Sequence, residues 1–284
     1  MGLFTFNYSK PGPGVSKDAP RKKNVFLYFE LFGRKFIKLL QASWIHCLCS
    51  IPYLVIMFLF IDMFFGSYIQ NLLAVVLQGQ SSADEINLLL FVVCSFLTCV
   101  IFVLWGSGPS SAGFAYITRC FVREEHAWIL TDYLEKFKEN FKQSMILVVL
   151  DFVMLYLLGN AIIQYWILYS SQNQLLWMML LYISVLMLII YTFMHAPAYQ
   201  VMVTYDCKFK QLLKNSAFLA LGRAPINLVL ACICVVVLWL LFNYFQPFVA
   251  ILAVVALLFG FLRFPLEFNS ARMIQKVMKS SKGK

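Results

Sequence analysis

The chain has 284 residues, of which 62% are hydrophobic and only 13% are charged. A soluble globular domain is about one-half apolar and one-quarter charged, so this composition excludes an ordinary soluble domain and is typical of a membrane protein. The net charge of +10 does not indicate nucleic-acid binding, because Lys and Arg are confined to short segments between apolar runs.

The first 39 residues are polar and basic, and they contain neither the short apolar core nor the cleavage site of a signal peptide. Within them, Asn24–Lys38 predicts an amphipathic helix, because Val25, Phe29, Phe32 and Phe36 recur at helical spacing. Such an elbow helix can lie in the membrane interface, with its aromatic face in the lipid and its basic face toward anionic headgroups.

Six apolar runs follow, each close to the roughly 20 residues that a helix needs to cross a bilayer. Short turns separate the third run from the fourth and the fifth from the sixth, which predicts tight hairpins. The sequence therefore predicts an all-α integral membrane protein, a bundle of about six transmembrane helices in three hairpins. The predicted spans are Leu40–Phe65, Ile86–Trp105, Met145–Tyr169, Leu175–Met194, Ile226–Phe242 and Phe248–Phe264.

The basic residues predict the orientation of these spans. All 23 Lys and Arg lie before span one, between spans two and three, between spans four and five, or at the C-terminal end, and the three opposite loops contain none. By the positive-inside rule, both termini lie in the cytoplasm of a multi-pass cell-membrane protein. The predicted parts are a cytoplasmic segment (1–39), a six-span domain (40–264) and a basic cytoplasmic tail (265–284).

The segment between spans two and three contains a second predicted amphipathic helix. A capping pattern at Asp132 predicts a helix over Asp132–Lys142, on which Tyr133, Phe137 and Phe141 form an apolar stripe. Two interpretations are open: a surface helix that stabilises the bundle, or a face that docks a partner.

A charged stretch, Arg123–Trp128, precedes this helix. Glu124, Glu125 and His126 are consecutive, and consecutive residues do not share a helix face, so a metal site is not predicted there. We interpret the stretch as a solvated linker or, with the stripe, as a partner surface. The candidate contact residues are Arg123, Glu124, Glu125, His126, Trp128, Phe137 and Phe141.

A nine-residue pattern recurs before spans one, three and five. It reads KFIKLLQAS at Lys35–Ser43, KFKENFKQS at Lys136–Ser144 and KFKQLLKNS at Lys208–Ser216. We interpret it as three copies of one unit, in which a basic elbow precedes a helical hairpin and a proline ends or kinks the second helix. The alternative is that elbows with the same task resemble one another. The three prolines are Pro109, Pro197 and Pro265.

Few polar residues lie within the predicted spans. Asp62 falls near the outer end of span one, whereas Asp151 lies about 9 Å below the membrane surface, six residues into span three. An acid at that depth is a candidate functional residue, either protonated or paired with a basic residue of an elbow. Asn160 and Gln164, further along span three, are candidates for hydrogen bonds between helices.

Signatures of enzymes are missing from the sequence. It contains no phosphate-binding G-x-x-x-x-G-K-[ST] loop, no G-x-S-x-G elbow and no H-E-x-x-H helix. The eight cysteines lack the paired C-x-x-C spacing of a zinc site and are interpreted as small apolar residues. We therefore expect no enzymatic activity, no catalytic residue, and no cofactor or metal.

Three strings carry a family resemblance: KPGPGVSKDAPRKK (Lys10–Lys23), GPSSAGFAYITRCFVREEHAW (Gly108–Trp128) and TDYLEKFKENFKQ (Thr131–Gln143). They resemble the YesL family of bacterial membrane proteins, with Ser110-Ser111 in place of an expected Ala-Thr. The second half of the chain matches only in its alternation of apolar spans. The resemblance implies a domain of unknown function, often beside sugar-uptake ABC transporters, and no catalytic residue.

The resemblance and the polar residues of the spans lead to three functional hypotheses. The first is an accessory or assembly subunit of a carbohydrate ABC importer, in contact with the lipid bilayer and with permease or solute-binding subunits. The second is an independent small-solute transporter centred on Asp151, Asn160 and Gln164. The third is a regulator that relays the state of a transporter to a sensor kinase. Neither the glycan, the stoichiometry nor the oligomeric state follows from the sequence.

Overall fold

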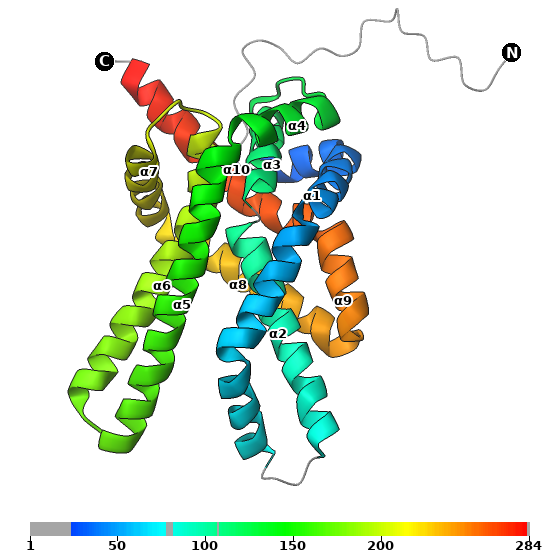
Figure 1. Ribbon diagram of the computed structural model, residues 1–284. Helices are drawn as coiled ribbons and strands as arrows, with labels where there is room; N and C mark the ends of the chain where they lie inside the picture. Colours follow the sequence, from blue (N-terminus) through cyan, green and yellow to red (C-terminus); the bar gives the residue numbers. More distant parts are fainter. Residues whose placement is uncertain (1–23, 78–81, 107, 283–284) are drawn as a thin grey trace, which may run out of the picture.

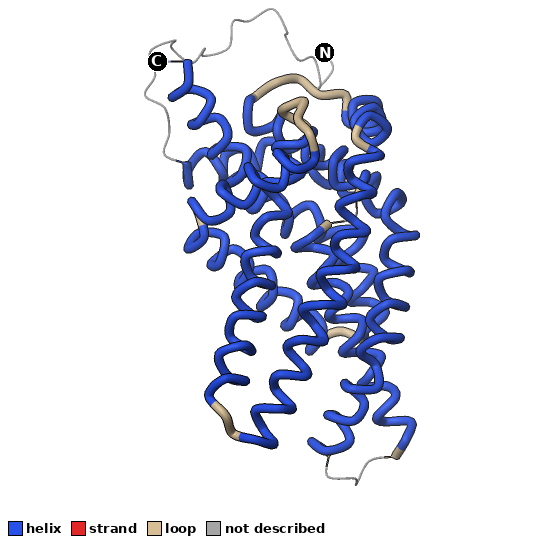
Figure 2. The backbone as a smooth tube through the Cα atoms, turned by 60° about the vertical axis from the view of Figure 1, so that its left-hand side comes forward, coloured by secondary structure: helices blue, strands red, loops and turns tan. Residues whose placement is uncertain are grey.

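The computed structural model describes residues 24–77, 82–106 and 108–282, and every regular element within these ranges is helical (Figures 1 and 2). The predicted all-α bundle is confirmed. Residues 1–23, which include the string Lys10–Lys23, lie outside these ranges. The elements are α1 (Asn24–Val76), α2 (Ala83–Trp105), α3 (Pro109–Arg123), α4 (Ile129–Glu139), α5 (Phe141–Gln172), α6 (Leu175–Met202), α7 (Phe209–Gly222), α8 (Ala224–Tyr244), α9 (Pro247–Ala253), the π-helical turn η1 (Val254–Leu258) and α10 (Phe259–Lys282).

Six of these helical runs are long and apolar enough to cross a membrane: α1, α2, α5, α6, α8 and the run from α9 through η1 into α10. The architecture is that of a multi-pass membrane protein. In Figure 1 the α1–α2 and α5–α6 hairpins end at the bottom, and the α8–α9 turn lies higher. At the top lie α4, α7 and the end of α10, and we call this end the basic side because these elements carry many of the described Lys and Arg residues.

Helix α1 is longer than the sequence predicts. The predicted elbow Asn24–Lys38 continues into span one without a break, and the predicted outer loop is helical from Gly66 to Val76. Leu and Ala in that stretch favour helix, which accounts for the extension. Asp62 is therefore exposed within a helix rather than close to its end. The predicted boundaries after residues 39 and 264 fall inside α1 and α10.

Helix α2 has well-defined ends. It begins at a capping box, in which the Ser82 hydroxyl accepts from the Glu85 amide and the Glu85 carboxylate accepts from the Ser82 amide. It ends at Trp105, because Gly106 and Gly108 have φ of +89° and +64°, a backbone conformation that favours glycine. A Cβ on Gly108 would also lie only 2.6 Å from the Val148 side chain.

The segment after α2 is not an exposed linker. It forms α3, which is buried along most of its length, from Pro109 to Val122. Its small residues, among them Ala112 and Gly113, allow neighbouring helices to approach closely. A Cβ on Gly113 would lie 2.9 Å from the Tyr133 carbonyl oxygen, so α4 packs directly on this face.

The three prolines have different roles. Pro109 begins α3, but Pro197 and Pro265 lie inside α6 and α10, so of the predicted end or kink, the helix end does not occur at these two positions. Proline is tolerated within membrane helices because neighbouring groups satisfy the freed backbone atoms. Helices α3, α6 and α10 each pack against the other two. The chain that follows the three prolines thus forms the centre of the fold.

The three copies of the nine-residue pattern differ in backbone structure but share one buried position. The first copy lies within α1, the second spans the break between α4 and α5, and the third leads into α7. The last residue of each copy, Ser43, Ser144 or Ser216, is fully buried. The burial of this serine in all three copies favours three copies of one unit over three unrelated elbows that resemble one another. An elbow exposed to solvent does not require a buried serine.

Helix α4 begins earlier than predicted. Its first residue is Ile129, not Asp132, because the Asp132 carboxylate accepts a hydrogen bond from the Trp128 amide (2.9 Å) and so closes the preceding turn. Of the predicted stripe, Tyr133 is fully buried, Phe137 is partly buried and Phe141 is 49% exposed. The stripe thus packs largely against the bundle.

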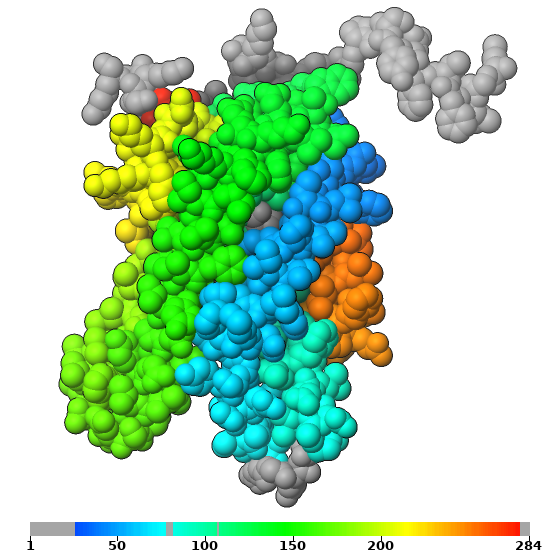
Figure 3. Space-filling view, viewed as in Figure 1, coloured from blue at the N-terminus to red at the C-terminus, as the bar shows by residue number. Residues whose placement is uncertain are grey.

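On the face shown in Figure 3, α1 and α5 lie side by side. Their contact is made by large aromatic side chains: the rings of Phe60 and Phe152 lie 4.9 Å apart, and those of Phe64 and Tyr156 lie 5.0 Å apart.

Candidate functional site

Asp151 of α5 lies in the core and is 1% exposed. Its Oδ1 accepts a hydrogen bond from the Tyr191 hydroxyl (2.6 Å) and lies 2.7 Å from His195 Nε2. Both partners come from α6, so the expected pairing with a basic residue of an elbow is not what the structure has. A buried carboxyl group is tolerated only where such partners compensate for lost hydration.

The geometry of His195 defines where its protons lie. Its Nδ1 is 3.0 Å from the Tyr191 carbonyl oxygen, an acceptor only, so Nδ1 carries a hydrogen. The 2.7 Å distance between Nε2 and Asp151 Oδ1 accommodates a second proton between these two atoms. The pair holds it either as imidazolium with carboxylate or as neutral imidazole with carboxylic acid. In both arrangements the net charge of the pair is zero.

Trp105, the last residue of α2, covers the imidazole. Its ring is stacked on His195, with centroids 5.1 Å apart and planes 6° apart, and its Nε1 donates to the Thr192 hydroxyl (3.0 Å). An indole face attracts a cation, so this contact stabilises a protonated His195. Helices α2, α5 and α6 therefore meet at the Asp151–His195 pair.

A second buried pair lies in α10. Arg263 Nε donates to Glu267 Oε1 (2.9 Å), and both side chains are fully buried. Arg263 Nη1 also donates to the carbonyl oxygens of Val103 (3.1 Å) and Leu104. The guanidinium group thus caps the C-terminal end of α2, where unpaired carbonyls and the helix dipole favour a cation.

Gln200 of α6 extends this network. Its Nε2 donates to Glu267 Oε2 (2.7 Å) and to the Ala115 carbonyl oxygen of α3 (3.0 Å). The central helices α3, α6 and α10 are therefore joined by polar contacts as well as by packing. Networks of this kind specify a unique arrangement only when every member is satisfied.

Several atoms of the network are not satisfied. Within the described part of the chain, the Tyr53 hydroxyl, Arg263 Nη2 and Gln200 Oε1 are buried without a hydrogen-bond partner. Tyr53 and Tyr199 both interact electrostatically with Asp151 and with Arg263, so the tyrosines connect the two pairs. An unpaired buried polar group costs about 1–3 kcal/mol, and water or a small polar ligand is its usual partner.

The break between α2 and α3 borders this cluster. A Cβ on Gly106 would lie 3.6 Å from the Tyr199 ring, and the Tyr199 hydroxyl lies beside the Gly108 amide. Interrupted helices at membrane depth are found where the exposed backbone lines a polar site. We therefore take Tyr53, Asp151, Tyr191, His195, Tyr199, Gln200, Arg263 and Glu267 as the candidate functional site and call it the polar core.

An uncharged cluster joins α1, α3 and α4 nearby. Ser110 Oγ lies 2.9 Å from His46 Nδ1 and 2.5 Å from the Tyr133 hydroxyl, which donates to the Ser110 carbonyl oxygen (2.8 Å). Burial raises the pKa of Tyr133 well above its usual range, so this hydroxyl stays neutral. Phe259, directly after η1, stacks on the His46 ring at 3.8 Å. This cluster fixes α4 against the bundle.

Two predicted intramembrane residues do not join the polar core. Asn160 lies about 13 Å beyond Asp151 along α5, and its amide donates to the Tyr156 carbonyl oxygen of the same helix (2.9 Å). Gln164 is exposed, and its amide lies 3.4 Å from the Tyr68 hydroxyl of α1. Only Gln164 thus makes the predicted bond between helices.

The charged stretch Arg123–Trp128 lies on the basic side between α3 and α4. Glu124 adopts a left-handed conformation (φ +60°) that ends α3, and its carboxylate accepts from Arg34 of α1 (2.5 Å). Arg123 lies 3.8 Å from both Glu125 and the Met278 sulfur. The stretch therefore ties α1, α3 and α10 together.

Trp128, the last residue of this stretch, is 70% exposed. Its ring packs edge-on against His126 at 5.0 Å. Leu130, Leu134 and Phe141 are exposed apolar side chains of the neighbouring helices. Of the predicted partner surface, Glu124, Glu125, His126, Trp128 and Phe141 are exposed to another molecule.

Sequence reasoning found Asp151 but missed the rest of the polar core. A signal for two members was present in the repeat, since His195 and Arg263 each stand two residues before the proline of their unit. Glu267 and Tyr199 likewise each stand two residues after it. Tyr53 had no comparable signal, because a tyrosine within an apolar span is common.

Comparison with known proteins finds similarity to one family over part of this site. A family model described as "Protein of unknown function, DUF624" matches residues 86–160. The matched stretch runs from α2 through the glycine break, α3 and α4 to Asp151 and Asn160 in α5. No curated protein and no solved structure matches the chain.

Proposed function

We propose that this protein is a proton-coupled carrier of a small polar solute, with Asp151 and His195 as its proton-handling pair. The proposal rests on the convergence of Asp151, His195, Arg263 and Glu267 from α5, α6 and α10 within one membrane-spanning bundle. Ionisable groups at membrane depth are rare, and they commonly mark ion or substrate pathways. Converging acids beside an interrupted helix are features of coupled carriers.

The proposed coupling follows from the charge of the Asp151–His195 pair. With its shared proton the pair is neutral, and release of that proton leaves one net negative charge in the core. Arg263, whose Nη2 has no partner in the described residues, interacts electrostatically with the same tyrosines as Asp151. This negative charge is attracted to Arg263 of α10. Release of the proton therefore strengthens the attraction between the α5–α6 hairpin and α10.

Reconstitution of the full chain in lipid vesicles tests this proposal. A pH-sensitive dye in the lumen reports proton movement while gradients of neutral mono- and oligosaccharides, amino acids and organic acids are imposed in turn. We expect at least one solute to drive proton movement, and we expect Asp151→Asn to abolish it. Asp62→Asn is the matched control, because Asp62 is an exposed acid of α1 and is expected to leave the movement unchanged.

The two variants are first compared by thermal unfolding, so that loss of transport is not confused with loss of the fold. If Asp151→Asn unfolds, His195→Gln serves in its place. Proton movement that is unaffected in the folded Asp151 and His195 variants would reject the proposal. No solute-driven movement with the unaltered protein would also count against it.

A second proposed function is that of an accessory subunit of a carbohydrate ABC importer. The observation that favours it is the 70% exposure of Trp128, with Leu134 and Phe141, on the basic side. Large exposed aromatic side chains are the commonest anchors of protein interfaces. The resemblance to the YesL family supplies the expected partners, a sugar permease or solute-binding subunit. In this function the protein has no enzymatic activity of its own.

Purification from native membranes in mild detergent tests the accessory function. Permease or solute-binding subunits recovered in fixed proportion are the expected result, and Trp128→Ala is expected to release them. Trp166→Ala, at an exposed tryptophan in the far half of α5, is the control and should retain them. A protein recovered alone would reject this function, and recovery of a sensor kinase would favour the regulatory hypothesis instead.

Both proposed functions require the orientation that the basic residues predict, in which the basic side of a cell-membrane protein faces the cytoplasm. Reporter fusions to each loop test this orientation. A reporter that is active only outside the cell should be inactive when fused after Lys284 and active when inserted in the α5–α6 turn.

A further inference from the structure

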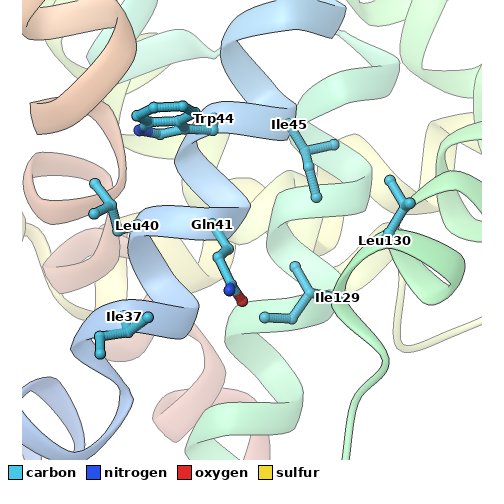
Figure 4. A pocket seen from close by; sticks show the side chains of 7 residues that line it. All are labelled: Ile37, Leu40, Gln41, Trp44, Ile45, Ile129 and Leu130. Carbon is cyan, nitrogen blue, oxygen red and sulfur yellow. The ribbon is translucent and has the colours of Figure 1, made fainter.

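A groove opens between α1 and the start of α4 on the basic side (Figure 4). Its volume is about 520 Å³. In Figure 4 the side chain of Gln41 projects between the two walls, toward Ile129. The other lining residues are apolar: Ile37, Leu40, Trp44 and Ile45 of α1, and Ile129 and Leu130 of α4.

The walls of the groove remain open to the surroundings of the protein. Ile37 is 70% exposed, and Trp44 and Leu130 are each 57% exposed. Gln41 makes no hydrogen bond with any other described residue. An exposed apolar channel with a single amide at its centre fits a ligand that is a hydrocarbon chain next to a polar linkage, such as the ester of a phospholipid.

The charges next to the groove favour an anionic ligand. Arg34 already pairs with Glu30 (4.0 Å) and Glu124 (2.5 Å), and the Lys35 ammonium lies 5.6 Å from the centre of the Phe121 ring. Lys38, by contrast, has no ion pair, hydrogen bond or ring contact within the described part of the chain. It adjoins Ile37 and stands three residues before Gln41, and residues at that spacing are neighbours on a helix surface.

We propose that this groove binds one anionic phospholipid, with an acyl chain along Leu40, Trp44 and Leu130 and the headgroup phosphate beside Lys38. The Gln41 amide lies between these two parts, where the ester linkages of the lipid stand. Tryptophan is enriched at this depth of membrane proteins, and an unpaired lysine at the bilayer surface attracts anionic lipids. This binding site is independent of the polar core and of either proposed function.

A transmembrane helix of a partner is the other occupant that such a groove admits. A lipid fits the observed charges better, because the free cation lies at one edge of the groove, where a headgroup would stand. A partner helix would have to place an acidic side chain opposite Lys38. The experiment below separates these occupants.

Tryptophan quenching by brominated lipids tests the proposal. The full chain is reconstituted in vesicles of phosphatidylcholine with increasing phosphatidylglycerol, and the bromine is carried on the acyl chains of one lipid at a time. The signal of Trp44 is the difference between the unaltered protein and Trp44→Phe. We expect phosphatidylglycerol to quench Trp44 about fivefold more effectively than phosphatidylcholine at equal mole fraction, the factor expected for one lysine beside an anionic headgroup.

Variants of two lysines test whether Lys38 causes the preference for phosphatidylglycerol. Lys38→Gln is expected to equalise quenching by the two lipids, whereas Lys210→Gln, at an exposed lysine of α7, should leave the preference intact. Equal quenching by both lipids in the unaltered protein would overturn the proposal, as would a preference that survives Lys38→Gln. A photo-crosslinker at Leu130 should form lipid adducts in native membranes, and protein adducts alone would also overturn it.

Discussion

Polar residues have opposite surroundings in the two halves of α5. In the half near the basic side, α5 meets α6 and α3, and Asp151 is fully enclosed by partners from α6. In the far half, Gln164 is exposed and makes one long hydrogen bond to Tyr68 of α1. Asp151 and Gln164 are both polar residues of one apolar span. What distinguishes them is the packing around them, which sets how much an unpaired polar group would cost.

The largest effect is expected at Arg263, because it serves both the ion pair with Glu267 and the end of α2. Replacement by Met leaves Glu267 buried without its cation and two carbonyl groups without a donor. We expect Arg263→Met to lower the free energy of unfolding by about 3–5 kcal/mol. Unfolding by SDS in mixed micelles measures this change.

Arg34→Met is the control for that variant, since Arg34 pairs with Glu124 at an exposed site and such pairs contribute at most about 1 kcal/mol. In the double variant with Glu267→Leu, the loss should be smaller than that of Arg263→Met alone. A loss below about 1 kcal/mol for Arg263→Met would show that water replaces the guanidinium group.

The second-largest effect on stability is expected at Asp151. Replacement by Leu removes the acceptor of two buried donors, the Tyr191 hydroxyl and His195 Nε2, and we expect a loss of about 2–3 kcal/mol in the free energy of unfolding. Asp151→Asn keeps an acceptor oxygen and should cost about 1 kcal/mol. Equal losses for Leu and Asn would mean that the carboxyl group is not hydrogen-bonded as described.

Much of the fold follows from local sequence. Length and hydropathy are enough to predict the six membrane-spanning runs, because each must satisfy its own backbone in lipid. Helix ends were harder to predict: α1 runs on past Gly66, and Pro197 and Pro265 do not end their helices. The reason is that tertiary contacts, which a single sequence does not reveal, decide whether a weak helix signal is overridden.

The candidate site was predictable only at Asp151, which stands out as an acid in an apolar span. The other members are distant in sequence, and their roles arise from the mutual packing of α3, α6 and α10. Arg263 was counted with the basic residues of the C-terminal end, although it is fully buried. A charge near the end of a span looks the same in sequence whether it faces solvent or a helix terminus.

Substitution of Gly113 tests the close packing of α3 on α4, near the basic side, without changing any charge. A methyl group there would meet the Tyr133 carbonyl oxygen at 2.9 Å and the Tyr133 ring at 3.0 Å, so α4 would have to shift. We expect Gly113→Ala to lower the midpoint of thermal unfolding, at a cost of about 1–3 kcal/mol. Gly33→Ala in α1 has open space around its Cβ and should stabilise by up to about 1 kcal/mol. Equal responses at both glycines would argue against the close packing of α3 on α4.

The smallest effect is expected in the far half of α5. Gln164→Leu removes a hydrogen bond of 3.4 Å between exposed side chains, and bonds between helices in membranes contribute about 0.6 kcal/mol on average. We expect a change of at most about 0.6 kcal/mol in the free energy of unfolding, and the same for Tyr68→Phe. The double variant should then lose no more than either single one, because both remove the same bond. A loss above about 2 kcal/mol for Gln164→Leu would place a second polar site between the hairpins, and the contrast between the two halves of α5 would no longer hold.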